Sequence, residues 1–535
     1  MSITPAIVWE DPPEIETEPA PQPPATQTDA TDLDRITADV RGGIVAALMD
    51  ANSTAAEQRR EISALVVSAL GKVGNLYFHA DRKDFDSAMF FDAYRKRLLR
   101  IHADAFTAWL SDWLRINRAD TLFKHVFAEV ETAALSSPQT TAILPESFWA
   151  SRPGAIYLSN GDGVAVRITA AAVAFVDNGT NGVLFAAGRT LAPWKLTDPQ
   201  DPFETCALFR NAHTSAGHAP HLLRLWLYSL PSNPRSKPPL CMAGEVGSGK
   251  TRLAKGFAEF YGLPFVAHKV EERAESDFWP CLDAGGLFIL DNADSKTKWL
   301  ADAVANAATD GCSQRRKLYT NAETVTLRPR AWLAVTTANP TFASDSGLAD
   351  RLLPVRMAPR DEETSDAALT DEILAARDGG LSHLAYTLQK ALADTAPTPP
   401  GLNKRHPDFA AFAVRIGRAL GREAEAVSAL KAAEADKSAF CLENDTIAAA
   451  LLARLRTAGP FTGTAAELVP HLVEIDADLR DRLSARRLGK RLSALWPHLK
   501  AQLATAKQEK DRNDLTIYTL KARSADCAGF QMRFH

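Results

Sequence analysis

The sequence predicts an α/β fold in the middle of the chain, with helical regions on both sides of it. Strand-like apolar runs alternate with helical patterns between two proline-rich joints, residues 231–239 and 396–407, as in domains built around a parallel sheet. One of these runs, residues 240–243, leads through a glycine-rich turn into a helical pattern at residues 253–260. A chain of 535 residues has room for about three or four domains.

Composition divides the chain into six predicted segments. Before Arg35 there are eight acidic residues, a run of prolines and no basic residue, which predicts disorder. Short β-branched and aromatic runs at residues 155–158, 164–168, 173–176 and 183–187 predict a small β unit. Near the other end, helical patterns at 465–472 and 485–496, the second of them basic, and a strand-like run at 515–520 predict a winged helix-turn-helix. The segments are an acidic, proline-rich, disordered tail (1–34), an N-terminal adaptor of helices and a small β unit (35–200), an α/β core (201–360), a helical lid (361–455), the winged helix-turn-helix (456–524) and a C-terminal tail (525–535).

Composition also excludes several classes of protein. The six cysteines include no C-x-x-C pair, which argues against a zinc site and against disulfide staples. The longest nearly apolar stretch, residues 168–176, is far shorter than the about 20 residues that span a bilayer. A net charge of −4 gives no overall attraction to nucleic acid, so any such binding depends on local basic patches. We therefore expect a cytoplasmic protein without membrane contact.

The glycine-rich turn, residues 244–251, fits the phosphate-loop pattern G-x-x-x-x-G-K-[ST] at every fixed position. Glycines let the backbone point several N–H groups at a phosphate, Lys250 reaches the β and γ oxygens, and the Thr251 hydroxyl can ligate Mg²⁺. The motif therefore predicts ATP and Mg²⁺ as ligands. The predicted ATP-binding residues are Gly244, Gly247, Ser248, Gly249, Lys250 and Thr251.

A second apolar strand, residues 287–290, ends in Asp291, which we predict to hold Mg²⁺ together with Thr251. The next residue is Asn292, where many ring-forming ATPases have a glutamate that serves as the base for the attacking water. An amide cannot take a proton at neutral pH, so the identity of the base stays open. Asp294 and Glu245 are the alternatives, and slow turnover is a third.

A third strand, residues 332–336, runs into Asn339, which we predict to orient the water and to sense the γ-phosphate, with Thr337 as the second choice. Twelve residues further on, Arg351 precedes another apolar strand. We predict that it reaches the nucleotide of a neighbouring subunit, and the alternative is an ion pair within the chain, for instance with Asp350. The predicted catalytic residues are Lys250, Asp291, Asn292, Asn339 and Arg351.

Two basic segments are candidates for DNA contact. One lies in the hairpin-like stretch 311–330, and the other is a helix in which basic residues repeat at i and i+4. A solvated loop or an intersubunit salt-bridge element is the alternative for the first, and a solvated surface helix for the second. The predicted DNA-binding residues are Arg315, Arg316, Lys317, Arg486, Arg487, Lys490 and Arg491.

With these motifs in order, residues 238–357 resemble AAA+ ATPases, and among them superfamily 3 helicases and the helicase part of primase-helicases of phages, plasmids and mobile elements. The likeness lies in the phosphate loop, Phe288-Ile289-Leu290-Asp291-Asn292, Lys317-Leu318-Tyr319-Thr320-Asn321 and Leu348-Ala349-Asp350-Arg351. Residues 77–200 resemble the adaptor of those proteins, and residues from 460 onward their winged helix. The segment before the adaptor is too short for a primase module, so primer synthesis is not expected.

The resemblance implies an AAA+ core at residues 201–360 and a ring-forming ATPase, expected as a homo-hexamer, that acts on single-stranded or forked DNA as a helicase, translocase or loader in the replication of a mobile genetic element. An alternative is a non-motor, ATP-dependent oligomeric switch in assembly or phage defence, which recruits a protein partner through its acidic tail or winged helix. Asn292 favours this alternative. A small-molecule kinase is a weaker one, because it needs neither Arg351 nor the basic segments.

Overall fold

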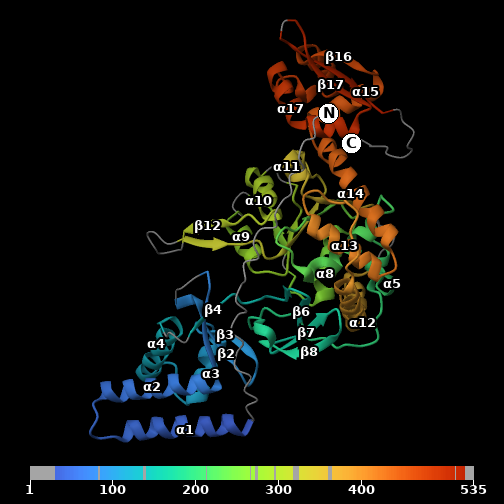
Figure 1. Cartoon of the computed structure of the whole chain (residues 1–535). Coiled ribbons are helices and arrows are strands. Elements are labelled where there is room, and N and C mark those ends of the chain that lie inside the picture. Colours follow the sequence, from blue (N-terminus) through green and yellow to red (C-terminus); the bar gives the residue numbers. More distant parts are fainter. Residues whose placement is uncertain are drawn as a thin grey trace, which may run out of the picture. The chain divides into compact units, whose positions relative to one another are not determined.

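The computed structural model (Figure 1) divides the chain into two compact units. The first comprises residues up to Glu146 together with Asp177–Gly188, and the second comprises Ser147–Val176 and the chain from Arg189 onward. The adaptor predicted over residues 35–200 is therefore divided between them. The described residues are 30–81, 85–136, 140–212, 214–265, 267–271, 275–294, 297–316, 324–359, 364–512 and 514–523.

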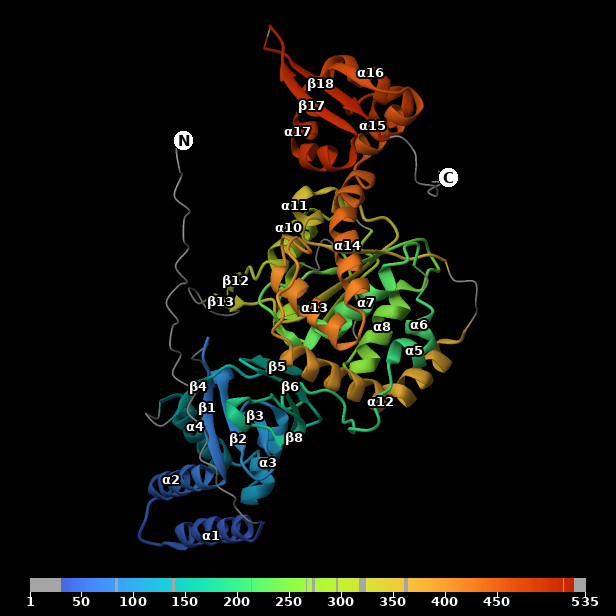
Figure 2. The ribbon, with the colours of Figure 1, turned by 45° about the vertical axis from the view of Figure 1, so that its right-hand side comes forward.

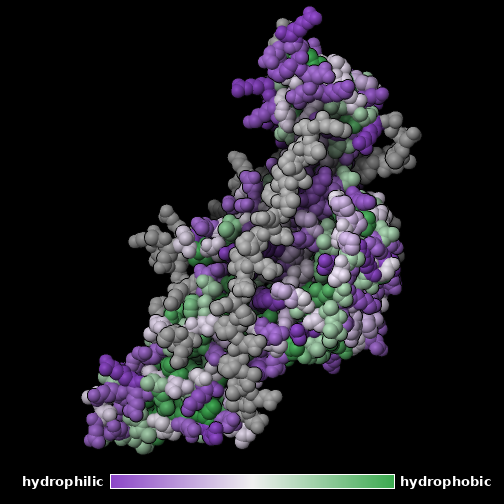
Figure 3. Space-filling view, in the orientation of Figure 1, coloured by the Kyte–Doolittle hydropathy of each residue, from purple (hydrophilic) through white to green (hydrophobic). Residues whose placement is uncertain are grey.

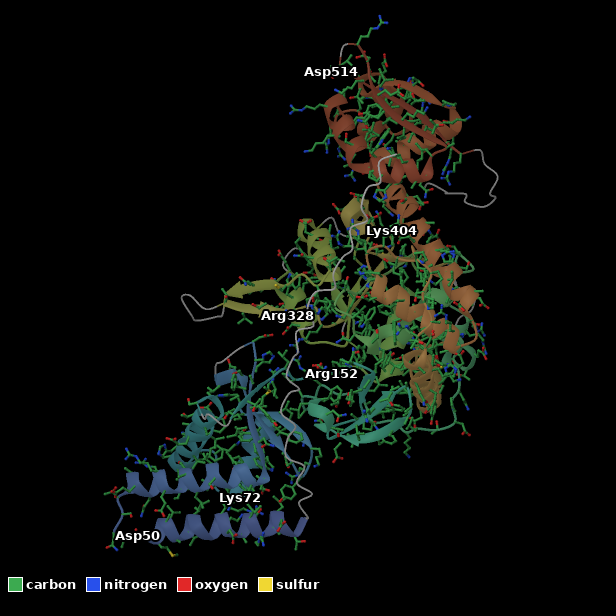
Figure 4. All side chains as sticks on the ribbon, viewed as in Figure 1. Asp50, Lys72, Arg152, Arg328, Lys404 and Asp514 are labelled. Carbon is green, nitrogen blue, oxygen red and sulfur yellow. The ribbon has the colours of Figure 1, made fainter. Side chains whose placement is uncertain are left out.

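The first unit is helical with one small sheet. Its described strands follow the order β3-β2-β1-β4, with β4 parallel to β1 and the other pairs antiparallel. Asp50 lies in the turn between the first two helices (Figure 4), and Thr54 and Glu57 form a capping box at the start of the second. The elements are α1 (Ala30–Met49), α2 (Ala55–Val73), β1 (Gly74–His79), η1 (Phe85–Ser87), β2 (Ala88–Asp92), β3 (Arg97–Arg100), α3 (Asp104–Leu114), α4 (Thr121–Ser136), β4 (Thr141–Ile143) and η2 (Thr180–Gly182).

Two boundaries in this region differ from the sequence prediction. Residues 30–34, predicted to be disordered, form the first turns of α1, so this part of the tail prediction was wrong, and residues 1–29 lie outside the described residues. The strand-like run 183–187 makes only isolated bridges, through Phe185 and Ala186. Its apolar side chains are instead buried in the first unit, where Leu184 packs with Phe91.

The second unit begins with an antiparallel meander in the order β5-β6-β7-β8, which includes the first three strand-like runs predicted from residue 154 onward. Short helices lead from it to the central sheet. These elements are β5 (Trp149–Arg152), β6 (Ala155–Ser159), β7 (Val164–Thr169), β8 (Val173–Asp177), α5 (Pro202–Thr205), α6 (Ala207–Arg210), α7 (Ala219–Ser229) and η3 (Leu230–Ser232).

The central sheet has the strand order β10-β11-β14-β9-β15, and every described pair in it is parallel. Side chains of a strand alternate between the two faces. In β9, Leu240 and Met242 join the larger core cluster, whereas Cys241 and Ala243 join a second cluster on the other face. The sheet is therefore buried on both faces, as a parallel sheet requires. Its strands are β9 (Leu240–Ala243), β10 (Ala267–Lys269), β11 (Leu287–Asp291), β14 (Trp332–Thr337) and β15 (Leu353–Arg356).

Helices cover the sheet, and a two-stranded hairpin projects from the rest of the unit (Figures 1 and 2). The hairpin consists of β12 (Ser313–Arg316) and β13 (Thr324–Leu327), and residues 317–323 between them lie outside the described residues. The helices are α8 (Lys250–Tyr261), α9 (Glu275–Asp283), α10 (Lys298–Ala308), η5 (Thr341–Ser344), α11 (Ser346–Ala349), α12 (Asp366–Ala393), α13 (Pro407–Ala419) and α14 (Glu423–Glu443).

The C-terminal part packs helices on a small antiparallel sheet in the order β16-β18-β17. The helices predicted at 465–472 and 485–496 and the strand predicted at 515–520 coincide with α16, α17 and β18. None of the described helices is long and apolar enough to cross a membrane. The elements are α15 (Thr446–Thr457), β16 (Phe461–Thr464), α16 (Ala465–Ile475), η6 (Ala477–Leu479), α17 (Ala485–Gln502), β17 (Thr505–Lys510) and β18 (Thr516–Lys521).

Arg377, on α12, closes the C-terminal end of α8. Its buried guanidinium donates to the carbonyl oxygens of Phe260 and Tyr261, at 3.2 and 3.1 Å, where the helix leaves carbonyls without a partner of its own. It also donates to the carbonyl oxygens of Ala192 and Pro193, at 2.6 and 2.9 Å. One side chain thus ties the end of the phosphate-loop helix to the segment that follows the meander.

We expect Arg377→Met to lower the free energy of unfolding by about 3 kcal/mol, because it leaves several buried carbonyls without donors. Lys390→Met is the matched control, since Lys390 is exposed on the same helix and its replacement should cost less than about 0.5 kcal/mol. Urea denaturation of the full chain measures both. Equal midpoints for the two variants would contradict this role of Arg377.

Candidate nucleotide-binding site

The phosphate loop lies between the carboxyl end of β9 and the start of α8, at the edge of the parallel sheet. Gly244 is required there, because a Cβ at this position would lie 2.4 Å from the carbonyl oxygen of Met357. Gly249 has a φ of 76°, in the left-handed region that favours glycine, immediately before the helix begins. The backbone thus turns so that a helix N-terminus, with its unpaired N–H groups, faces the loop.

Lys250 lies folded onto this loop. Its ammonium group donates to the carbonyl oxygens of Gly244 and Glu245, at 2.8 and 2.7 Å, and to the Ser248 hydroxyl at 3.1 Å. Burial lowers the pKa of Lys250, while the carboxylates of Asp294 and Asp291 act in the opposite direction. A bound phosphate would accept the hydrogen bonds that the Lys250 ammonium group now donates to the loop.

Asp291, at the end of β11, accepts hydrogen bonds from two hydroxyl groups. The Thr251 and Thr336 hydroxyls each lie 2.6 Å from its Oδ1 atom. Because the Thr251 hydroxyl donates a hydrogen bond to the carboxylate, its oxygen lone pairs remain available to a cation. The pair thus offers the hard oxygen ligands that Mg²⁺ prefers. The chain therefore brings together Thr251 and Asp291, the two residues predicted to hold Mg²⁺.

Asn292 turns the chain sharply after β11. Its φ is 53°, in the left-handed region that asparagine tolerates better than most residues, and its N–H donates to the Thr336 hydroxyl at 3.1 Å. Its own amide lies 3.4 Å from Asp291 Oδ2. The turn buries Ala293 and carries Asp294 back toward the end of β14.

Asp294 binds the turn that follows β14. Its Oδ1 atom accepts from the Thr337 hydroxyl at 2.7 Å and from the backbone N–H groups of Ala338 and Asn339 at 2.7 and 2.8 Å. Burial acts to raise the pKa of this carboxyl, but these three donors outweigh it and hold the pKa below its usual value. The predicted sensor Asn339 is thus fixed through its backbone, and its side chain is exposed.

Arg351 lies away from these residues. The register pairs Leu353 of β15 with Leu240, the first residue of β9, so Arg351 stands at the amino ends of the strands, opposite the phosphate loop. The four residues of β9 separate the two ends by about 13 Å. Arg351 donates to the carbonyl oxygen of Gly347 at 2.5 Å, and the Asp350 carboxylate pairs with Arg405 instead.

His406 supports the backbone at Arg351. It is fully buried, and its Nε2 atom lies 3.1 Å from the Arg351 carbonyl oxygen, which can only accept. Burial and the neighbouring charge of Lys437 lower the pKa of His406 to about 4, and the charges of Arg351 and Arg405 add smaller effects in the same direction. The hydrogen bond to the Arg351 carbonyl oxygen acts to raise the pKa but does not outweigh them. The imidazole is therefore neutral at pH 7.

This burial predicts a pH dependence of stability. Between pH 6.5 and about pH 4 the unfolded chain binds a proton at His406 that the folded chain does not. The free energy of unfolding should thus fall by up to about 3 kcal/mol as the pH drops through this window. Below about pH 4, His406 should cause no further loss, because it is then protonated in both states. Urea denaturation at pH 7.5 and pH 4.5 measures the loss, which should be smaller in His406→Gln. An equal loss of stability in the wild type and in His406→Gln would contradict this contribution of His406.

The basic hairpin is described only in part. Arg315, on β12, donates to the backbone carbonyl oxygens of Ser276 and Glu275 at 2.7 and 2.5 Å, so its guanidinium holds the start of α9. The side chain of Arg316, and all of Lys317, lie outside the described residues.

The basic helix α17 has two differently placed sets of cations. Arg491 pairs with Asp445, the N-cap of α15, with its Nη2 atom 2.6 Å from the carboxylate, and donates to the Ser344 carbonyl oxygen at 2.8 Å. Arg486, Arg487 and Lys490 are exposed. Hydrophilic side chains cover most of the visible face over α17 and the β17–β18 hairpin (Figure 3). Arg491 is therefore a packing residue in this structure, and the exposed three remain as candidates for DNA contact.

Sequence reasoning missed Thr336 and the hydrogen bonds of Asp294 to the end of β14 and the turn after it. The available signal for Thr336, which is fully buried beside Asp291, was a hydroxyl directly after the apolar run 332–335. Asp294 was considered only as a base, because nothing in the local sequence indicates which backbone groups its carboxylate meets.

No model of a known protein family matches the chain, and no curated protein matches it. The chain has a structural likeness to the A form of the apo C-terminal region of NrS-1, with 11% identity and a TM-score of 0.40, over 85% of this chain and 98% of that one. A second apo structure of that region gives 12% identity and a TM-score of 0.38 over the same shares. At these TM-scores the likeness carries no argument about function, which rests on the geometry of the site.

Proposed function

We propose that this chain is an ATP-hydrolysing enzyme of the AAA+ type that works on DNA. The observation that supports this best is the junction of the phosphate loop with the Thr251–Asp291 pair, whose oxygens lie 2.6 Å apart at the carboxyl edge of a parallel sheet. Ligands of α/β sheets bind at this edge. In the strand order β10-β11-β14-β9-β15, β14 lies between β11, which ends in Asp291, and β9, which leads into the phosphate loop. The proposed sensor Asn339 follows β14, and this neighbourhood supports the assignment.

In the proposed reaction the oxygen of a water molecule forms a bond to the γ-phosphorus of ATP. The bond from that phosphorus to the β,γ-bridging oxygen breaks, ADP leaves with the electron pair, and one proton of the water passes to solvent. Lys250 and the loop amides bind the phosphates, and the Asn339 side chain orients the water. Mg²⁺ held by Thr251 and Asp291 would supply positive charge against the phosphate oxygens.

The position of Arg351 supports an assembly of several copies. It stands at the opposite end of the sheet from its own phosphate loop, so it can serve a nucleotide only when that nucleotide belongs to another subunit. An arginine stabilises the charge that develops on the leaving phosphoryl group. We therefore infer a homo-oligomer with shared sites, and a hexameric ring is the form we propose.

Action on DNA is the finer part of the proposal. The exposed cations of α17 and the projecting β12–β13 hairpin are the surfaces that would contact phosphates. Helicase, translocase or loader activity in the replication of a mobile element would follow if hydrolysis moves these surfaces along a strand.

The test is ATP hydrolysis with and without single-stranded DNA, together with DNA binding. We expect DNA to stimulate hydrolysis. The double variant Arg486→Ala with Lys490→Ala should bind DNA about tenfold more weakly, and the slope of log affinity against log salt concentration should become less steep by about one to two. The control removes the same charge from Lys404 (Figure 4) and Lys431, both exposed outside α17, and should bind as the wild type does. Equal binding by both double variants would contradict a DNA role for α17.

A second candidate is an ATP-dependent oligomeric switch without motor activity. Asn292 favours it, because no carboxylate follows Asp291 directly and Asp294 is engaged with the turn after β14. Such a protein would bind ATP and assemble, but hydrolyse it slowly and open no duplex. A forked DNA substrate separates the two candidates.

A further inference from the structure

The Asp294 carboxylate connects three segments of the nucleotide site. It comes from the loop after β11, and its Oδ1 atom accepts three hydrogen bonds, one from Thr337 at the end of β14 and two from the turn that follows. The carbonyl oxygen of Thr337 accepts from the N–H of Gly244, the first residue of the phosphate loop, at 3.2 Å. Asp294, Thr337 and Gly244 thus form a continuous link from the metal-side strand, through the sensor turn, to the phosphate loop.

We propose that Asp294 is a positioning residue, which holds Asn339 in register with the phosphate loop, and that it is not the base that activates water. The proposal rests on the ATP hydrolysis proposed above. Two backbone N–H groups and one hydroxyl converge on a single oxygen of this carboxylate, which is the arrangement of a structural acceptor. The three donors fix this carboxylate against the end of β14 and the turn that follows, whereas a base must face the water that it deprotonates.

The left-handed turn at Asn292 provides this placement. Because φ is 53° at Asn292, the chain bends there and Ala293 is buried, with its N–H donating to the Thr336 carbonyl oxygen at 2.9 Å. Asp294 is thereby directed onto the end of β14. The three donors, together with the positive charge of Lys250, favour the charged form of the acid and hold its pKa below the usual value. An acid held ionised in this way is a weak proton acceptor at neutral pH.

Two substitutions distinguish a positioning residue from a base. Asparagine at position 294 keeps an oxygen that can accept all three hydrogen bonds but cannot take a proton, whereas alanine removes the oxygen. For Asp294→Ala we expect kcat to fall about 100-fold, since the sensor is displaced, with KM for ATP changed less than about threefold. For Asp294→Asn we expect kcat within about threefold of the wild type and an unchanged pH profile.

Several results would overturn the proposal. If Asp294 is the base, Asp294→Asn loses as much activity as Asp294→Ala, by about 100-fold or more, and its pH profile loses the acid limb. Unchanged kcat in Asp294→Ala would show that the sensor does not depend on the link. Circular dichroism and thermal unfolding establish that the variants are folded, and if the alanine variant is not, Asp294→Asn alone decides between the two roles.

Failure of the proposed function gives a different result. If the wild type binds ATP but does not hydrolyse it, the proposed enzyme activity fails, and the link is tested by nucleotide preference. The sensor would contact the γ-phosphate, so the ratio of the affinities for ATP and ADP should fall at least about tenfold in Asp294→Ala. Asp294→Asn should keep the ratio of the wild type. Equal preferences in the wild type and Asp294→Ala, measured by calorimetry, would then overturn the positioning role as well.

Discussion

Replacing Lys250 with alanine is expected to lower the rate of ATP hydrolysis about 100- to 1000-fold, because the variant loses the ammonium group that meets the β and γ oxygens. In the structure this group makes three hydrogen bonds within the loop, at 2.7 to 3.1 Å. The lysine is therefore already held where the phosphates would bind, and little ordering remains to be done on binding. Release of phosphate under saturating ATP measures the effect.

Lys255→Ala is the matched control for this experiment. Lys255 is on the same helix, one turn and a half further on, and its ammonium group lies 3.6 Å from Glu259 on the partly exposed side of the helix. Its loss removes the same charge and leaves the loop intact, so hydrolysis should stay within about twofold of the wild type. More than about a tenth of wild-type activity in Lys250→Ala would contradict a hydrolytic site at this loop.

Arg351→Ala is expected to reduce hydrolysis about 1000-fold while ATP binding to each chain persists. The register of β15 on β9 separates Arg351 from the phosphate loop of its own chain, so the arginine would act on a neighbour's nucleotide. Its backbone is held by His406, and the adjacent Asp350 is paired with Arg405, which leaves the Arg351 guanidinium outside that ion pair. The measurement is phosphate release beside nucleotide binding by the same protein.

Mixing the two inactive variants tests whether the site is shared. In random rings made from equal amounts, one seam in four joins the intact Lys250 of an Arg351→Ala chain to the intact Arg351 of a Lys250→Ala chain. About a quarter of wild-type activity should therefore return. No recovery, with mixed rings demonstrated by native mass spectrometry, would contradict the shared site and leave ATP binding by the single chain unaffected.

Local spacing predicts the phosphate loop and its place between a strand and a helix. The pattern Gly-x-x-x-x-Gly-Lys-Thr and the apolar strand before it occupy twelve consecutive residues, 240–251, so their relation is set by the chain itself. Asp291 was found for a related reason: the carboxyl ends of parallel strands meet at one edge of a sheet, and the structure gives the expected contact with Thr251. Helices α16 and α17 followed from their apolar periodicity.

Partners that are far apart in sequence were decided only by the tertiary structure. Arg491 repeats with Arg487 at i+4 and reads as part of an exposed basic face, but the packing of α17 brings it to Asp445, 46 residues away. Composition and periodicity assign a residue to a helix without specifying what lies opposite, so Arg491 could not be separated from Arg486 and Lys490. The same reason hid the contact of Arg315 with the start of α9.

The sequence by itself determined that a phosphate loop lies between a buried strand and a helix, and that an aspartate ends a neighbouring strand, because both follow from residue order and period. Only the tertiary structure decided that Asp294 meets Thr337, 43 residues away, and that Arg351 stands at the opposite end of the sheet from Lys250. The physical reason is local geometry that composition does not encode. The left-handed backbone of Asn292 sets the place of Asp294, and the register of β15 on β9 sets the place of Arg351.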